Sequence, residues 1–455
     1  MPETVAEIVA AHRAGTLTPE QTVTRCYARL RAHDDPAIFI SLKPEAEALA
    51  EARALPKDGA GLPLYGVPVA VKDNIDVAGL PTTAACPAFA YDAHRDAGAV
   101  ARLRAAGAIV IGKTNLDQFA TGLVGLRTPY GAPRNLFNPA LIPGGSSSGS
   151  AVAVAAGIVP LSLGTDTAGS GRVPAGFNNI VGLKPSLGLV STYGVVPACR
   201  TLDCVSLFGL TVDDCWTALQ AIAGADNKDP YSRNRPLGSL GAPPKAKIGV
   251  PRPGQRLFFG DRQFERGYAM AIARLGHLGC TIVEIDIEPF YETARLLYDG
   301  PWVAERTITV RSLLASAPEA IHPVTREIIL SGLRPSAIDA FTAFYRLEEL
   351  RRVADATFRS IDALALPTAP TIYTVAQVNA DPIQLNSRLG TYTNFVNLLD
   401  LCGLAVPATI TEAGIPFGIT LLAPGGNDAR LATIGRAFHA DTRLPLGALK
   451  EPQPA

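Results

Sequence analysis

The stretch that decides the fold is residues 143–175, PGGSSSGSAVAVAAGIVPLSLGTDTAGSGRVPA. Its middle predicts a helix, SAVAVAAG, and then a strand, PLSLG, because a run of small apolar residues is punctuated by glycine and proline. A serine-bearing glycine cluster stands at each end, with Ser146 before the helix and Ser170 after the strand. Glycine and small residues at both places let backbone N–H groups turn inward, and such concavities bind developing negative charge.

A lysine upstream completes the pattern. Lys72 ends the apolar strand VPVAV, where we expect its ammonium group to be partly desolvated. Desolvation lowers the pKa of a lysine and can make it a base near neutral pH. The plain alternatives are that the two clusters are ordinary loops and that Lys72 is a solvated strand end. Phosphate and dinucleotide loops are not indicated, because GxxxxGK[ST] and GxGxxG are absent there, and the AGSGR around Ser170 does not match the GxSxG nucleophile elbow.

Strands and helices alternate outward from this stretch. Residues 96–119 (DAGAVARLRAAGAIVIGKTNLDQF) and 264–287 each read as helix, glycine turn and buried strand. Residues 245–253 and 361–370 add further apolar strands, whereas residues 224–246 read as a long surface loop. This alternation predicts an α/β fold, with a large mixed, mostly parallel, twisted β-sheet that is covered by helices on both faces.

Composition narrows the class of partner. The 455 residues carry 41 Lys and Arg against 41 Asp and Glu, so the formal net charge is zero. We therefore expect a small-molecule substrate and neither nucleic acid nor membrane as a partner. The longest apolar stretch, residues 151–164, is interrupted by Pro160 and is too short to span a bilayer. Seven scattered cysteines without a CxxC pattern, and a beginning without signal-peptide features, predict a cytoplasmic protein with reduced thiols.

The motifs together resemble the amidase signature hydrolases. The resemblance runs from VPVAVKDNIDVAG (67–79) through TNLDQFATG (114–122) and the serine-rich stretch to GTDTAGSGRVPAGFNNIVGLKPS (164–186), and weaker features continue to the end. It implies one amidase signature domain over residues 1–445, with the signature core at about 65–210. Residues 446–455 are then a tail, which could link to a C-terminal domain.

The resemblance also implies a Ser–cis-Ser–Lys triad. In it Lys72 is the base, Ser146 is the bridging residue with a cis peptide bond, and Ser170 is the nucleophile. The implied oxyanion hole consists of four backbone N–H groups, those of Thr167, Ala168, Gly169 and Ser170. Ala168 stands where many relatives have glycine, and it keeps its N–H group.

The neighbours of the triad are expected to be structural. Asp166 and Arg172 are interpreted as a brace for the nucleophile loop. The remaining serines of the first cluster are interpreted as caps of the following helix, namely Ser147, Ser148 and Ser150. The implied chemistry uses no metal and no cofactor, and we interpret the six histidines as structural or surface residues.

A second region bears on the substrate. LLYDGPWVAERT (296–307) is similar to the segment with which allophanate hydrolases, one branch of the family, grip their substrate. The resemblance implies that Tyr298 and Arg306 contact the carboxylate-bearing substrate, and Gly122 in ATGLVG is a further candidate. A guanidinium offers a planar fork for a carboxylate. The predicted activity is hydrolysis of allophanate to ammonia and N-carboxycarbamate by a homodimer. The alternatives are a general amidase, a non-catalytic scaffold and an amidotransferase A subunit.

Overall fold

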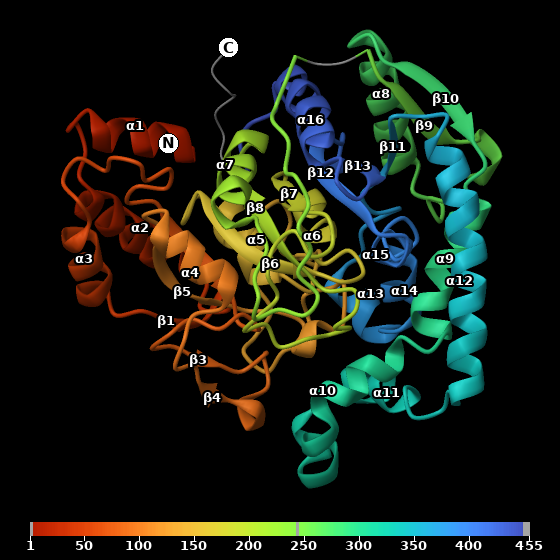
Figure 1. The fold of residues 1–455 in the computed structure, drawn as a ribbon, viewed down its shortest axis with the longest axis horizontal. Coiled ribbons are helices and arrows are strands. Elements are labelled where there is room, and N and C mark those ends of the chain that lie inside the picture. Colours follow the sequence, from red (N-terminus) through yellow and green to blue (C-terminus); the bar gives the residue numbers. More distant parts are fainter. Residues whose placement is uncertain (1–2, 243–244, 449–455) are drawn as a thin grey trace.

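The apolar runs of the sequence form one mixed sheet. A computed structural model describes residues 3–242 and 245–448 (Figure 1). In these ranges eleven strands pair in the order β1 (Phe39–Leu42), β5 (Ile109–Thr114), β2 (Pro68–Lys72), β6 (Leu161–Asp166), β8 (Cys204–Gly209), β7 (Val181–Lys184), β12 (Leu401–Ile410), β13 (Pro416–Pro424), β11 (Ala363–Pro367), β9 (Lys247–Pro251) and β10 (Thr281–Ile285). A separate pair joins β3 (Pro81–Thr82) to β4 (Tyr91–Asp92).

Parallel pairing is confined to the two flanks of the sheet. The α/β class and the mixed sheet are confirmed, but only β5–β2–β6 and β11–β9–β10 are parallel among the described strands. The pairings from β6 through β8, β7, β12 and β13 to β11 are antiparallel, as is β1 with β5. Parallel neighbours need a crossover, usually a helix. Residues 185–203, all of them described, place no helix between β7 and β8, and β12 and β13 form a hairpin, so the expected predominance of parallel strands fails in the middle of the sheet.

Helices cover both faces because successive strand residues point to opposite sides. On β5, Val110 joins the core under α4, α7, α8 and α16, whereas Ile109 and Ile111 join the core under α2, α3 and α5. The helices are α1 (Val5–Arg13), α2 (Pro19–His33), α3 (Glu45–Ala54), α4 (Gly98–Ala105), α5 (Ser148–Ala155), α6 (Val173–Phe177), α7 (Val212–Ile222), α8 (Arg262–His277), α9 (Glu288–Asp299), α10 (Val303–Ser316), α11 (Pro323–Ser331), α12 (Ala337–Phe358), α13 (Val375–Ala380), α14 (Gln384–Leu389), α15 (Phe395–Leu398) and α16 (Asp428–Thr442).

Single helical turns of 3₁₀ type complete the described secondary structure. They are η1 (Pro87–Phe89), η2 (Gln118–Ala120), η3 (Pro253–Gln255) and η4 (Pro318–Ala320). Within the described ranges, no helix combines the length and apolarity that a membrane crossing demands.

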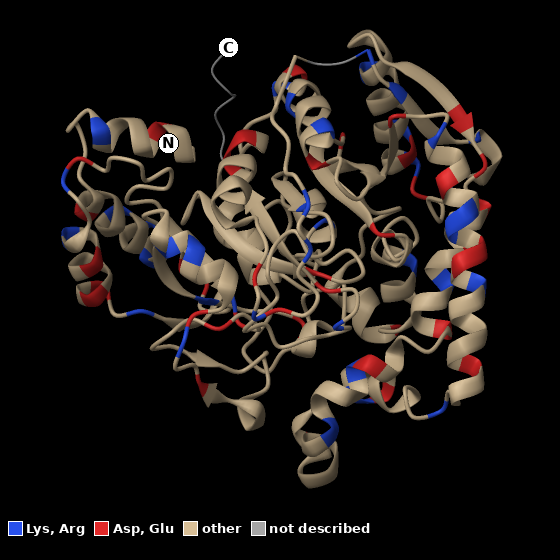
Figure 2. Cartoon of the chain, viewed as in Figure 1, with Lys and Arg blue, Asp and Glu red and all other residues tan. Residues whose placement is uncertain are grey.

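An excursion of four helices after β10 forms one side of the molecule. Figure 1 shows α9 and α12 side by side, with α10 and α11 extending below them. Acidic and basic residues are interspersed along α12 (Figure 2). Because α9 carries Tyr298 and α10 carries Arg306, this excursion supplies both predicted substrate-contacting residues.

The chain remains packed slightly beyond the predicted domain end at residue 445. Leu446 is buried in the core beside α5, and Asn179 Nδ2 donates to the carbonyl oxygens of Pro445 and Gly447. The amide of Ala448 donates to the carbonyl of Ala155. The first three residues of the predicted tail therefore contact the domain, and residues 449–455 lie outside the described residues.

Candidate active site

The edge of the sheet at which β5, β2 and β6 end gathers the polar residues of the signature stretch. Lys72 is the last residue of β2 and pairs in register with Thr114 of β5, while Asp166 is the last residue of β6. The carboxyl ends of parallel strands meet at the same edge, where open α/β sheets commonly bind ligands. Sequence neighbours of these strand ends therefore converge on one place.

Lys72 lies within hydrogen-bonding distance of two hydroxyl groups. Its side chain is fully buried, and its Nζ is 2.8 Å from Ser146 Oγ and 2.8 Å from Thr165 Oγ1. Asn74 Nδ2 donates to the same Thr165 oxygen at 3.3 Å. The structure thus brings Lys72 and Ser146 together as predicted, and it adds Thr165, whose role the sequence reasoning missed.

Burial sets the protonation of Lys72. Desolvation lowers its pKa from 10.5 to about 7, although the carboxylates of Asp117, Asp166 and Asp203 act to raise it. Arg306 also acts to lower it, because like charges disfavour a second cation nearby. A substantial fraction of Lys72 is therefore neutral near pH 7 and able to accept a proton.

Ser146 lies in the loop before α5, and the Gly145–Ser146 peptide bond is cis. Its carbonyl accepts a hydrogen bond of 3.0 Å from the amide of Asp117. The Asp117 carboxylate in turn accepts from three backbone amides, those of Val124, Gly125 and Arg127. A Cβ atom at residue 145 would lie 2.2 Å from Asp117 Oδ2, so this position needs glycine. Asp117, within the TNLDQFATG motif, thereby connects the two loops.

The other serines of the first cluster do not cap α5. Ser147 is the N-cap residue, but its hydroxyl donates to the carbonyl of Thr165 at 3.2 Å. Ser148 and Ser150 donate instead to the carbonyls of Asn115 and Leu163. The predicted capping is wrong, because neighbouring loop and strand residues lie close enough to take these bonds and bind α5 to the sheet.

Ser170 lies on the turn after β6. Its hydroxyl donates to the Gly122 carbonyl at 3.5 Å, which places Gly122 beside it. In the described part of the chain no hydrogen bond joins Ser146 Oγ to Ser170 Oγ. The geometry therefore shows a Lys72–Ser146 contact, whereas the Ser170 hydroxyl is turned to Gly122.

An internal ion pair shapes the turn that carries Ser170. Arg172 Nε and Nη2 donate to the two oxygens of Asp166 at 2.8 and 2.9 Å, and both side chains are fully buried. Burial opposes ionisation of Asp166, but Arg172 holds its pKa below the ordinary value. The carboxylate also accepts from the amides of Gly169 and Gly171, each at 3.0 Å. Asp166 and Arg172 thus brace the loop as expected.

This brace changes the predicted set of oxyanion donors. The Gly169 amide already donates to Asp166, so it is not free to bind a developing oxyanion. The amides of Thr167, Ala168 and Ser170 have no acceptor among the described residues. Three of the four predicted donors therefore remain available, and the prediction for Gly169 is corrected because the buried carboxylate competes for its N–H group.

Arg306 and Tyr298 meet beside this turn. Arg306 Nη2 donates to Tyr298 Oη at 3.3 Å, and its Cζ lies 5.4 Å from the centre of the tyrosine ring. Arg306 Nη1 donates to Thr121 Oγ1 at 2.9 Å and to the Ala120 carbonyl at 3.3 Å. Only 2% of Arg306 is exposed. Since Thr121 precedes Gly122, the guanidinium and the Ser170 hydroxyl contact the same short segment.

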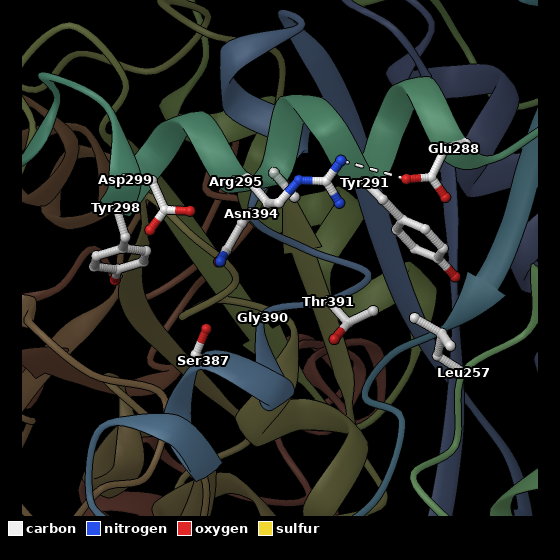
Figure 3. Close-up of a pocket in the computed structure, with 11 residues that line it drawn as sticks. Leu257, Glu288, Tyr291, Arg295, Tyr298, Asp299, Ser387, Gly390, Thr391 and Asn394 are labelled. Carbon is white, nitrogen blue, oxygen red and sulfur yellow. Dashed lines mark hydrogen bonds and ion pairs between the residues drawn. The ribbon is translucent and has the colours of Figure 1, made fainter.

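A groove of about 250 Å³ adjoins this pair. Figure 3 shows it between α9 and the segment 387–394, with Tyr298, Ser387 and Asn394 at one end and Tyr291 and Leu257 at the other. The segment continues to the nucleophile turn, because the Thr393 carbonyl accepts from Arg172 and a Cβ at Gly169 would lie 2.5 Å from Thr393 Oγ1. Tyr298 thus stands between the groove and Arg306.

Metal-ligand types do not gather here. Over the ranges that the structure describes, no group of three or more His, Cys, Asp or Glu side chains is placed to hold a metal ion. All seven cysteines are free, and six of them are buried.

Comparisons with known proteins all indicate the same protein family. A family model described as Amidase matches residues 21–432. The urea amidolyase of Lachancea kluyveri is 45% identical over 93% of this chain, which spans only 24% of that enzyme. The A subunit of a glutamyl-tRNA(Gln) amidotransferase from Legionella pneumophila is 34% identical over 92% of this chain and 93% of its own. The solved allophanate hydrolase of Kluyveromyces lactis superimposes with a TM-score of 0.91 at 42% identity, covering 98% of this chain and 74% of that one.

Proposed function

Because the chain belongs to the amidase family, we propose that it hydrolyses a carbon–nitrogen amide bond with Ser170 as nucleophile, and that its substrate is allophanate. The observation that carries the proposal is the buried Arg306 guanidinium, which is held by Tyr298 and Thr121 next to the segment that contacts the Ser170 hydroxyl. Allophanate combines a terminal amide with a carboxylate, which are the two groups that this arrangement is suited to receive.

The proposed chemistry begins with neutral Lys72. Its lone pair accepts the Ser146 hydroxyl proton while an N–H group donates to Thr165, which matches the two 2.8 Å contacts. Ser146 takes the proton of Ser170 after a rotation of that hydroxyl, and Ser170 Oγ attacks the amide carbon. Catalytic hydrogen bonds are often loose before substrate binds, so the 3.5 Å contact of Ser170 is compatible with this step.

The free amides of the turn then stabilise the tetrahedral intermediate. The oxyanion accepts from the amides of Thr167, Ala168 and Ser170, and each such donor is typically worth about 3 kcal/mol of barrier. The carbon–nitrogen bond breaks, and the leaving nitrogen receives a proton through Ser146 to depart as ammonia. Water then attacks the acyl group on Ser170, with the same relay accepting its proton. Each proposed step uses groups of this chain and needs no cofactor or metal.

The substrate carboxylate is assigned to Arg306. A charged guanidinium that is 2% exposed is costly unless an anion or several acceptors compensate it. Thr121, the Ala120 carbonyl and Tyr298 fix its plane by accepting from Nη1 and Nη2, so the carboxylate would bind at the remaining Nε and Nη2 hydrogens. Hydrolysis releases ammonia and N-carboxycarbamate, which loses carbon dioxide. The activity would belong to the breakdown of urea or s-triazine nitrogen.

The test is ammonia release from allophanate, malonamate, biuret and benzamide by the purified chain. We expect allophanate and malonamate, which carry a carboxylate, to exceed benzamide in kcat/KM. Turnover of benzamide without turnover of allophanate would favour a general amidase and refute the proposed substrate. Ammonia release from glutamine that appears only with added partner subunits would support the amidotransferase alternative, which the near full-length match to the Legionella pneumophila protein favours.

We further propose a homodimer in the cytoplasm with one amidase domain per chain, which includes the packed residues 446–448. The seven free cysteines support a reducing compartment. An apolar surface on α12 supports self-association: Ile338, Phe341 and Tyr345 recur at helical spacing and are 60–78% exposed. In a twofold dimer the same surface of both chains would meet. Light scattering should show a dimer that Phe341→Asp converts to a monomer, and a monomeric wild type at micromolar concentration would refute it.

A further inference from the structure

Asp203, which the proposed steps do not use, contacts the turn that carries the free amides. It precedes β8 and is only 7% exposed. Its Oδ1 accepts a hydrogen bond of 2.5 Å from the Thr167 hydroxyl, and its two oxygens also accept from the amides of Ala198 and Cys199. Thr167 is thus held through its side chain, while its own amide has no acceptor among the described residues.

The same segment is fixed from a second side. Asn397 Nδ2 donates to the carbonyl of Asp166 at 2.8 Å and to the carbonyl of Leu202 at 2.7 Å. The direction of the peptide between Asp166 and Thr167 is therefore set by Asn397, and the direction of the Thr167 side chain is set by Asp203. An oxyanion hole needs N–H groups of fixed direction, because donors that must reorient during the reaction stabilise the developing charge less well.

The loop that ends at Asp203 also contacts the helix that carries Arg306. Thr201 donates to the Glu305 carboxylate through its amide, at 2.9 Å, and through its hydroxyl, at 2.5 Å. Cys199 Sγ donates to the carbonyl of Trp302 at 3.4 Å. Residues 197–203 therefore form one piece that contacts α10 on one side and the nucleophile turn on the other.

We propose that Asp203 is a positioning residue, which orients the Thr167–Ser170 amides through the Thr167 hydroxyl and links them by the 197–203 loop to the helix that bears Arg306. This inference rests on the proposed amide hydrolysis. A purely structural role would be satisfied by the bonds from Ala198 and Cys199, which close the turn without involving Thr167.

The first test removes only the hydroxyl. Thr167→Val keeps the shape of the side chain, and we expect kcat to fall about 10- to 100-fold with KM changed less than about twofold. Thr167→Ser restores the hydroxyl and should recover kcat to within about threefold of the wild type. A folded Thr167→Val with wild-type kcat would overturn the inference, and so would a Thr167→Ser variant as impaired as the valine.

The second test removes the charge. Asp203→Asn should move the rising limb of the kcat/KM profile to lower pH, because a carboxylate facing Lys72 favours its protonated form. The other charged groups that face Lys72, namely Asp117, Asp166 and Arg306, stay in place. An unmoved limb in Asp203→Asn contradicts the expected influence of its charge.

Asp214→Asn is the matched control. Asp214 is another buried carboxylate, which accepts from the Thr211 hydroxyl and from the amides of Thr211 and Val5. Burial raises the pKa of the Asp203 carboxyl and that of the Asp214 carboxyl each to about 6. Asp214, however, belongs to the capping box at the start of α7, away from the nucleophile turn. Its asparagine variant should lose stability while kcat, KM and the pH profile stay at wild-type values. Any comparable fall in kcat would assign the Asp203 effect to general loosening.

Labelling of Ser170 by an organofluorophosphonate separates this inference from the substrate proposal. The Ser170 oxygen attacks phosphorus, fluoride leaves and the hydroxyl proton passes to Ser146, whether or not allophanate is the substrate. The phosphoryl oxygen of the reagent then lies against the free amides of the turn. If the wild type is labelled but does not hydrolyse allophanate, the substrate proposal fails and the labelling rates of the variants decide the inference. Slow labelling of Thr167→Val with recovery in Thr167→Ser supports it, and equal rates in all variants overturn it.

Discussion

Replacing Lys72 with methionine should inactivate the enzyme and yet stabilise it at neutral pH. The lysine is fully buried, and its pKa falls from 10.5 to about 7 on folding, chiefly by desolvation. The unfolded chain therefore binds more protons than the folded chain between pH 7 and 10.5. Stability of the wild type rises with pH across that window, because ∂ΔG/∂pH has the sign of the difference in bound protons, unfolded minus folded.

The magnitude follows from that shift. At 1.36 kcal/mol per pKa unit, burying the lysine costs roughly 4 kcal/mol at pH 7 and less than about 1 kcal/mol at pH 10. Methionine removes this cost but also removes the contacts with Ser146 and Thr165, worth about 1 kcal/mol each. The variant should be more stable than the wild type by roughly 2 kcal/mol at pH 7, and less stable by roughly 1 kcal/mol at pH 10.

Guanidinium unfolding of both proteins at pH 7, 8, 9 and 10 measures this difference, since titrations common to both proteins cancel. Ammonia release measures activity, which should fall at least about 1,000-fold with the base removed. In the wild type, kcat/KM should rise with pH through about 7, as Lys72 loses its proton. A stability difference that is constant from pH 7 to 10 would refute the assignment of a neutral buried lysine, as would a flat activity profile from pH 6 to 8.

Three further outcomes are expected. Ser170→Ala should abolish hydrolysis and organofluorophosphonate labelling but unfold like the wild type. Ser162→Ala, which changes a buried serine within β6, should keep hydrolysis and labelling. Labelling that persists in Ser170→Ala would exclude Ser170 as the nucleophile. Arg306→Ala should lower kcat/KM for allophanate roughly 30- to 1,000-fold but change that for benzamide little, and equal losses on both amides would remove Arg306 from carboxylate binding. Asp166→Asn should cost about 3–5 kcal/mol in a denaturation curve, because it leaves a buried guanidinium uncompensated; a change below about 1 kcal/mol would show that the ion pair does not brace the loop.

The sequence predicted the elements that carry the site because those elements are local. The strands before Lys72 and Asp166 and the helix after Ser146 appear where glycine, proline and apolar periodicity place them. The antiparallel centre of the sheet could not be predicted in the same way. It depends on which strands pair after the long loop from residue 185 to 203, and pairing across such a loop leaves no periodic signal.

Competition for hydrogen bonds explains why the predictions for the oxyanion donors and for the helix caps were partly wrong. Motif position alone offers the Gly169 amide as a donor and the serines of the first cluster as caps. In the folded chain the Gly169 amide donates to the Asp166 carboxylate, and the Ser147 hydroxyl donates to the carbonyl of Thr165. Such outcomes depend on which acceptor is nearest in space. For the same reason the TNLDQFATG motif alone does not indicate a role for Asp117, although its carboxylate holds three amides of the neighbouring loop.

The guanidinium of Arg306 is among the charges that depress the proton affinity of Lys72. An anionic ligand bound to that guanidinium would offset its positive charge, so binding of the ligand would raise the pKa of the Lys72 amine. The acid limb of kcat, which reports the loaded enzyme, would then lie at higher pH than the limb of kcat/KM, which reports the empty one. With an uncharged amide substrate the acid limbs of kcat and kcat/KM would lie at the same pH. The pH difference between the two limbs would therefore report whether a negative charge is bound at Arg306.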